Sequence, residues 1–220
     1  MWRANRRSPS ISGPSEPHAS RLYASLARLY DPLFRLVFEP RHRLALRLLA
    51  PAPGARVLDV GVGTGLSVRH YSQRTYVVGI DISSAVLDLA ARKVRRRRLA
   101  HVSLCRMDAC RLAFPSGCFD LVLSAFVASV VADRETYFEE LKRVCRPRGT
   151  ICIINHVHFR TQPLAWLERR LKPLAQRLGW HADLSLEEIV ENLRPGQVSV
   201  HSLWPIDPWP VVICRRSPSA

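Results

Sequence analysis

The chain has 220 residues, of which 47% are hydrophobic, and this length and composition predict one globular domain with short appendages. Its net charge is +15, and only three of its 33 basic residues are lysines, which indicates either a compositional bias towards arginine or an anionic partner. No apolar run approaches the roughly 20 residues that span a bilayer, no apolar signal segment follows the charged start, and the six cysteines lack zinc-ligand spacing. We therefore expect a cytoplasmic protein without a metal.

The first 50 residues divide into two segments. Residues 1–19 are rich in Ser, Pro and Arg without periodicity, which predicts a disordered arm. Over residues 20–50, leucines recur at helical spacing between arginines, and Pro32 and Pro40 divide the segment into short amphipathic helices. Such a basic segment can lie on an anionic membrane or pack on the sheet as a lid.

The most informative motif is the apolar stretch 57–60, which runs into Gly61, Gly63 and Gly65. Glycine adopts positive φ and lets the backbone approach a ligand closely. The spacing G-x-G-x-G departs from the dinucleotide fingerprint G-x-G-x-x-G, because position 66 is leucine. A second apolar strand ends in Asp81, and a carboxylate at the carboxyl end of that strand can accept hydrogen bonds from a ribose diol.

Further signals follow in chain order. The basic run 92–98 predicts a helix end that is either solvated or faces a phosphate. Strands are predicted at 102–105 and 119–124, and a helix and turn at 141–150 precede a strand at 151–154. A helical insertion is predicted over about 161–195, with a capping box at Ser185, and an antiparallel hairpin over 197–204 and 211–215.

These motifs, in this order, resemble the class I S-adenosyl-L-methionine-dependent methyltransferases. The resemblance implies an α/β, Rossmann-like, seven-stranded methyltransferase domain at 51–216, following N-terminal amphipathic helices. It also implies that S-adenosyl-L-methionine is the methyl donor, with S-adenosyl-L-homocysteine as its product. The residues that it implies at the donor site are Asp59, Gly61, Gly63, Thr64, Gly65, Asp81, Ile82, Met107, Asp108, Ala109 and Ser124.

Several stretches more specifically resemble the bacterial phosphatidylethanolamine N-methyltransferases of the Rhodobacter type. They are residues 29–34, 61–67, 127–133, 143–147, the pair Asn155-His156, and 171–174 with 178–180. Three departures stand out: that family commonly has Glu at position 59 and Phe at position 157, and it carries Gly-Leu-Phe in the region 205–210. These differences leave the donor motifs intact and bear on the acceptor.

The narrower resemblance implies N-methylation of phosphatidylethanolamine and its mono- and dimethyl derivatives towards phosphatidylcholine. We expect a monomer that associates peripherally with the inner membrane. The candidate catalytic residues are Tyr30, Asn155 and His156, and the candidate acceptor-binding residues are Tyr23, Tyr30, Arg41, Arg43 and His158. Aromatic faces attract methylated ammonium groups and arginines bind phosphodiesters. The alternatives are packed tyrosines, a buried hydrogen-bonded histidine and solvated arginines.

Other functions remain open at this point. A small-molecule or quinone C- or O-methyltransferase of the same fold would share every donor motif. A nucleic-acid methyltransferase would fit the charge, but the exit 124–127 from the fourth strand lacks the two prolines of base-amino methyltransferases, so nucleic acid is not an expected partner. A non-enzymatic binder would show a broken donor motif, and this one is complete.

Overall fold

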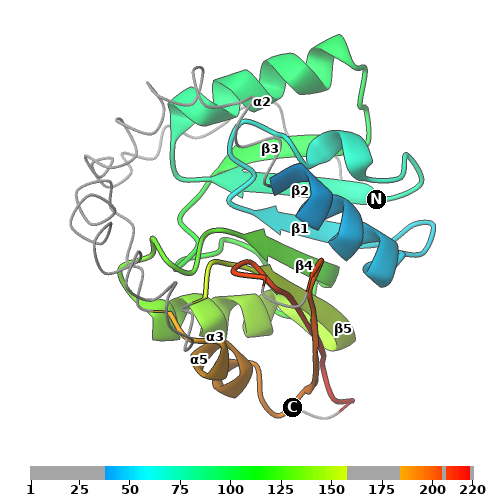
Figure 1. The fold of residues 1–220 in the computed structure, drawn as a ribbon. Helices are drawn as coiled ribbons and strands as arrows, with labels where there is room; N and C mark the ends of the chain where they lie inside the picture. The colour runs from blue at the N-terminus through cyan, green and yellow to red at the C-terminus, as the bar shows by residue number, and fades with distance from the viewer. Residues whose placement is uncertain (1–37, 158–183, 205–206, 219–220) are drawn as a thin grey trace.

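The structure is a computed structural model that describes residues 38–157, 184–204 and 207–218 (Figure 1). Its strands are β1 Arg56–Val60, β2 Tyr76–Asp81, β3 Val102–Arg106, β4 Phe119–Ala125, β5 Cys145–Ile154, β6 Gln197–His201 and β7 Val211–Arg215. Its helical elements are a helix over 38–49, the 3₁₀ turn η1 Val68–His70, α2 Ser84–Arg96, α3 Arg134–Val144 and α5 Leu186–Asn192.

The seven strands form one sheet in the order β3-β2-β1-β4-β5-β7-β6. The first five strands are parallel, and β7 runs antiparallel to both of its neighbours. This arrangement confirms the predicted α/β, Rossmann-like sheet of seven strands. The arm 1–19, the segment 20–37 and most of the predicted insertion lie outside the described residues.

Both faces of the central strands are buried, which explains their nearly continuous apolar sequences. On one face Val122 and Ile151 pack with Phe138 and Leu141 of α3. On the other face the helix 38–49, η1 and α2 cover the sheet. Figure 1 shows the helix 38–49, in blue, in front of the sheet, with α3 and α5 on the far side.

Local sequence accounts for where two of the helices begin. The carboxylate of Asp133 accepts a hydrogen bond from Thr136 N at 3.0 Å and so caps α3. The hydroxyl of Ser185 accepts from Glu188 N at 3.0 Å, which confirms the predicted start of α5. Among the described residues there is no helix with the length and apolar character required to cross a membrane.

The structure differs from the sequence expectations around the fifth and sixth strands. The strand β5 begins at Cys145, directly after α3, because the predicted turn is absorbed into the strand beside an irregularity in its pairing with β4. Arg148 has a φ of +60° there, a left-handed conformation that residues other than glycine rarely adopt. The strand β6 ends at His201 rather than at residue 204.

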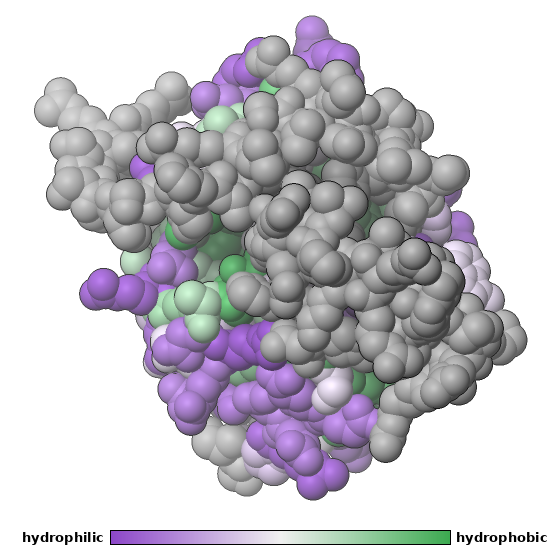
Figure 2. All heavy atoms as spheres, turned by 60° about the vertical axis from the view of Figure 1, so that its left-hand side comes forward, coloured by the Kyte–Doolittle hydropathy of each residue, from purple (hydrophilic) through white to green (hydrophobic). Residues whose placement is uncertain are grey.

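The parallel strands all end at the same side of the sheet, here called the carboxyl edge, and this geometry gathers the predicted site residues. Figure 2 brings that side forward and shows apolar surface among the described residues, lying between hydrophilic regions. The opposite side, where these strands begin, is called the amino edge.

Candidate active site

The segment between β1 and η1 forms a loop at the carboxyl edge, here called the glycine loop, residues 61–65. Gly61, Gly63 and Gly65 have φ values of +71°, +54° and +77°, which side chains other than glycine rarely adopt. The backbone N–H groups of Gly61 and Val62 both donate to Ile80 O at 2.9 Å. The loop is therefore fastened to the end of β2.

The three glycines serve different purposes. A Cβ atom on Gly61 would lie 2.2 Å from the Val127 side chain, and one on Gly65 would lie 3.0 Å from Ala90 of α2. A Cβ on Gly63 would meet no atom of the described residues closer than 3.9 Å. Gly61 and Gly65 are thus required by packing, whereas the space beside Gly63 stays open for a ligand.

Asp81 ends β2, as the sequence predicts, and its carboxylate faces the glycine loop. It accepts hydrogen bonds from Gly63 N at 3.0 Å and from Ser83 N at 2.9 Å. Burial raises the pKa of Asp81, and the two N–H donors partly oppose that rise. The hydroxyl of Ser83 is buried without a hydrogen-bond partner among the described residues, so a polar group beside Asp81 is left for a ligand.

The other predicted loop and adenine-side residues lie next to Asp81. Met107 N donates to Asp81 O at 3.0 Å, which holds the segment 107–109 beside the end of β2. The Asp108 carboxylate accepts from Cys110 N at 2.9 Å. Lys93 of α2 donates to the Thr64 hydroxyl at 3.1 Å.

Two predicted donor residues direct their side chains into the protein. Asp59 is buried and accepts a hydrogen bond from the Ser67 hydroxyl at 2.6 Å, while burial raises its pKa. The Ser124 hydroxyl accepts a hydrogen bond from the hydroxyl of Tyr137, a buried residue of α3, at 2.7 Å. Asp59 therefore supports the glycine loop from below, and a donor contact by either residue would be made through the backbone.

On the acceptor side, Asn155 and His156 follow β5 at the carboxyl edge, as predicted. The Asn155 side chain is buried, where it donates to His156 O at 3.0 Å and accepts from Ser129 at 3.5 Å. Val157 packs into the core beside α3, so the His156 side chain lies on the opposite face of the extended chain. There its ring meets Trp209 edge-on at 5.9 Å between centroids. The candidates Tyr23, Tyr30 and His158 lie outside the described residues.

Arg41 differs from its predicted role. Its guanidinium is only 1% exposed, donates to the Asp207 carboxylate at 2.8 Å, and lies over the rings of Trp204 and Trp209 at 4.9 and 4.6 Å. An accessible phosphodiester clamp and a solvated surface charge are both contradicted, because the β6–β7 connection covers this side of the helix 38–49. Arg43 is exposed, as either expectation requires.

The residues that partner Arg41 were missed by the sequence reasoning. Asp207 also accepts from Leu203 N at 2.9 Å and Trp209 N at 3.0 Å, so it organises the turn between β6 and β7. The sequence signal for this site was the acid Asp207 between Trp204 and Trp209. Its partner Arg41 could not be identified from it, because Arg41 lies 166 residues earlier in the chain.

Of the basic run 92–98, Lys93 reaches the glycine loop through its hydrogen bond to Thr64, whereas the described arginines of the run point elsewhere. The helix α2 begins beside Asp81 and runs for 13 residues, so its end at Arg96 lies about 20 Å from that start, towards the amino edge. Arg92 and the arginines at 95–98 are exposed. The structure favours the solvated interpretation of this run over one in which it faces a phosphate in the active site.

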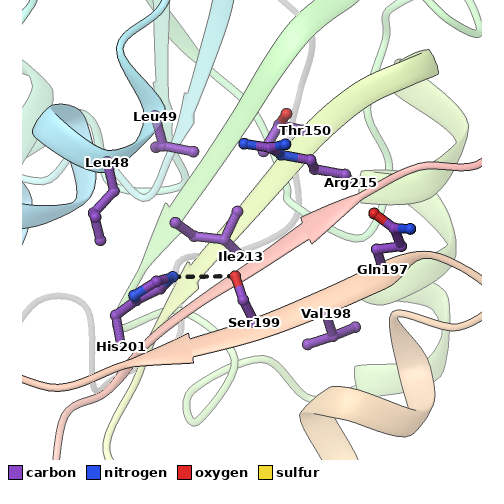
Figure 3. A pocket seen from close by; sticks show the side chains of 9 residues that line it. All are labelled: Leu48, Leu49, Thr150, Gln197, Val198, Ser199, His201, Ile213 and Arg215. Carbon is purple, nitrogen blue, oxygen red and sulfur yellow. Dashed lines mark hydrogen bonds between the residues drawn. The ribbon is translucent and has the colours of Figure 1, made fainter.

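A hollow of about 430 Å³ also lies away from the glycine loop. It runs along β6 and β7 under the end of the helix 38–49, and its polar lining includes a hydrogen bond of 3.1 Å between Ser199 and His201 (Figure 3). Thr150 and Arg215 place one end of the hollow at the amino edge. We therefore do not assign it to the donor.

Known proteins show the same combination of motif and fold. Residues 58–153 match a family described as a methyltransferase domain. A phosphatidylethanolamine N-methyltransferase from Cereibacter sphaeroides is 43% identical over 177 residues, which cover 80% of this chain and 86% of that protein. A demethylmenaquinone methyltransferase from Renibacterium salmoninarum is 31% identical over 140 residues, which cover 61% of this chain and 57% of that protein.

The fold is shared with solved structures as well. The Haemonchus contortus phosphoethanolamine N-methyltransferase 2 in complex with S-adenosyl-L-methionine matches with a TM-score of 0.71 at 18% identity, covering 93% of this chain and 61% of that one. Three features of this chain fit S-adenosyl-L-methionine: the space beside Gly63, the hydrogen-bond-accepting carboxylate of Asp81, and the buried Ser83 hydroxyl, which has no partner among the described residues. The chain therefore belongs to the class I S-adenosyl-L-methionine-dependent methyltransferases.

Proposed function

We propose that this methyltransferase methylates the amino nitrogen of phosphatidylethanolamine, and of its mono- and dimethyl derivatives, towards phosphatidylcholine. It would act as a peripheral monomer at the inner membrane surface. The observation that carries the proposal is the 43% identity to a phosphatidylethanolamine N-methyltransferase, because the match spans 86% of that protein.

The donor site supplies binding and orientation. S-Adenosyl-L-methionine, when bound, provides a methyl group that its positive sulfur activates for transfer. Asp81 would accept hydrogen bonds from the ribose diol, Asp108 would accept one from the adenine amino group, and the backbone at Gly63 would allow close approach. Such positioning can supply up to about 7–11 kcal/mol of the barrier in well-aligned systems.

The acceptor nitrogen must lose a proton before it can attack, because a lipid ammonium has a pKa of roughly 10, by analogy with lysine. His156 lies at the carboxyl edge beside Trp209, whose ring also contacts Arg41 of the helix 38–49. We infer that His156 takes up this proton and that Asn155, fixed by its hydrogen bonds, orients the His156 backbone.

Trp209 adds an aromatic surface next to His156. A methylated ammonium can no longer donate enough hydrogen bonds to be held by polar groups alone, and aromatic rings attract it by about 0.5–2 kcal/mol. We propose that Tyr23 and Tyr30 also bind the methylated ammonium. Arg43 and His158 are proposed to bind the phosphate group of the lipid.

A second candidate is methylation of a quinone or another small molecule, which is favoured by the 31% identity to a demethylmenaquinone methyltransferase. The two candidates share the donor site and differ in the acceptor atom. A carbon or oxygen acceptor must also release a proton to a base, but it carries no methylated ammonium, so it gives no reason for an aromatic surface beside the histidine.

The discriminating experiment offers both acceptors to the purified protein. Radiolabelled S-adenosyl-L-methionine is incubated with vesicles that contain phosphatidylethanolamine, with vesicles of phosphatidylglycerol alone, and with demethylmenaquinone in the same phosphatidylglycerol vesicles. The proposal predicts label in the phospholipid fraction of the first sample only. Label in the quinone, with none in phosphatidylethanolamine, would establish the second candidate instead.

A further inference from the structure

The helix 38–49 is fastened to the segment that follows the glycine loop. One carboxylate oxygen of Glu39 pairs with the guanidinium of Arg69, and the other lies 3.3 Å from Nε2 of His70. Arg69 and His70 belong to η1, which begins three residues after Gly65. The three side chains are 12–21% exposed, so their interaction is better shielded from water than an ordinary surface ion pair.

Two buried contacts lie behind this attachment. Ser67, the residue before η1, donates to Asp59 at 2.6 Å. His42, one turn after Glu39 on the helix, is buried, and its electrostatic effect opposes the rise that burial causes in the Asp59 pKa. The helix and the end of the glycine loop are therefore joined at the surface by Glu39 and in the interior near Asp59.

The helix itself is also fixed by packing against the sheet, in an apolar cluster that includes Val62 of the glycine loop and Val68 of η1. The ring of Phe38 lies 3.9 Å, centroid to centroid, from Phe126, the first residue after β4. Ala45 and Leu46 are buried against the sheet. The contact between Glu39 of this helix and Arg69 therefore helps to hold η1 in place, and η1 is the segment that follows the three glycines.

That transmission matters because glycine loops are costly to order. Each glycine gains backbone freedom that folding or ligand binding must remove. A loop already held in its binding conformation binds more tightly than one that the ligand must order. On the β2 side, Asp81 holds Gly63 through its N–H, and on the η1 side Glu39 holds Arg69.

We propose that Glu39 is a positioning residue for the methyl donor: it does not touch the donor, but through Arg69 it holds the glycine loop in the conformation that binds it. The inference rests on donor binding alone, so it stands or falls independently of which acceptor the enzyme methylates.

Calorimetric titration with S-adenosyl-L-homocysteine tests the proposal on the full chain. Glu39→Gln and Arg69→Gln should each weaken binding by about tenfold, the effect expected for one charged hydrogen bond. The double variant should bind no more weakly than either single variant, because both remove the same contact. With S-adenosyl-L-methionine as the varied substrate, KM should rise while kcat changes less than twofold.

Glu188→Gln is the matched control, because Glu188 pairs with Arg134 at 3.2 Å on the other side of the sheet. It should lose an ion pair yet keep its affinity for S-adenosyl-L-homocysteine. Thermal melting follows every variant, and Glu39→Asp, which keeps the charge one methylene farther from Arg69, replaces Glu39→Gln if that variant does not fold. Affinity within twofold of the unaltered protein in the folded Glu39 variant would overturn the proposal, as would full additivity in the double variant.

Discussion

A Cβ atom on Gly61 would lie 2.2 Å from Cγ2 of Val127, whereas one on Gly63, two residues later, would lie 3.9 Å from its nearest neighbour in the described part of the chain. Both glycines have positive φ, so both carry the same backbone requirement. They differ in what surrounds them: the first is enclosed by protein and the second faces the space assigned to the donor.

Alanine substitutions at these two positions should therefore separate folding from donor binding. Gly61→Ala should lower the free energy of unfolding by about 2–5 kcal/mol, because overpacking against Val127 adds to the left-handed strain. Gly63→Ala adds only the left-handed strain, so it should lower the free energy of unfolding by about 1–2 kcal/mol, yet it should weaken binding of S-adenosyl-L-homocysteine at least tenfold. Urea unfolding and calorimetry measure the two quantities.

Gly54 provides the control for backbone strain. Its φ is +82°, no atom in the portion of the chain that the structure describes lies within 4 Å of the added Cβ, and it precedes β1 at the amino edge. Gly54→Ala should match Gly63→Ala in stability but bind S-adenosyl-L-homocysteine normally. Equal affinity in the two variants would mean that the space beside Gly63 is not the donor site.

Arg41 should affect stability more than acceptor binding. Removing one partner of a buried ion pair leaves an uncompensated charge, so Arg41→Met should lower the free energy of unfolding by about 3–5 kcal/mol. The exposed Arg43 is the control, and Arg43→Met should change stability by less than about 0.5 kcal/mol. A stable Arg41→Met protein whose KM for lipid vesicles rises sharply would restore the role of a phosphate clamp.

His156 should affect the rate of methyl transfer without affecting donor binding. A positioned proton acceptor typically contributes 10²–10⁴-fold, so His156→Gln should lower kcat for phosphatidylethanolamine by about a hundredfold or more. Its affinity for S-adenosyl-L-homocysteine should stay the same. His201→Gln, which alters a histidine in the separate hollow, should keep full activity. Unchanged kcat in the His156 variant would remove this residue from the mechanism.

His70 should make the protein less stable in mild acid. Burial, followed by the charge of Arg69, lowers the pKa of His70 from 6.5 to about 4. Between these values the unfolded chain binds a proton that the folded one does not, so stability falls as the pH drops from about 6.5 to 4. Burial raises the pKa values of Asp59 and Asp81, which contributes the opposite slope above the usual Asp pKa.

Comparing the unaltered protein with His70→Gln isolates the histidine from those carboxyl groups. Urea unfolding at a series of pH values between 7 and 4.5 should show a smaller loss of stability in the variant. Parallel curves for the two proteins would mean that His70 titrates normally in the folded state.

Local patterns were enough to predict the framework of the donor site. The apolar strands and the glycine spacing predicted β1, β2 and the loop between them, and Asp81 falls at the end of β2 as expected. Strand burial on both faces makes such segments unmistakable, because their sequences are apolar without alternation. The start of β5 was missed since its pairing with β4 is irregular there.

Side-chain partners across long separations could not be predicted in this way. Arg41 was interpreted from the polarity of its neighbours, but its environment is set by Asp207 and Trp209, which only the folded sheet brings near. The same holds for Glu39 and Arg69, whose pairing depends on how the helix 38–49 crosses the sheet. Pattern and propensity carry no information on such contacts.

Mass spectrometry of vesicle lipids after incubation with S-adenosyl-L-methionine tests the proposed activity most directly. Phosphatidylethanolamine should decrease while its mono-, di- and trimethylated forms accumulate, and the Gly63→Ala protein should form them at least several-fold more slowly when S-adenosyl-L-methionine is below saturation. An unmodified phosphatidylethanolamine pool, in the presence of a folded enzyme that binds S-adenosyl-L-homocysteine, would contradict the lipid acceptor while leaving the donor site intact.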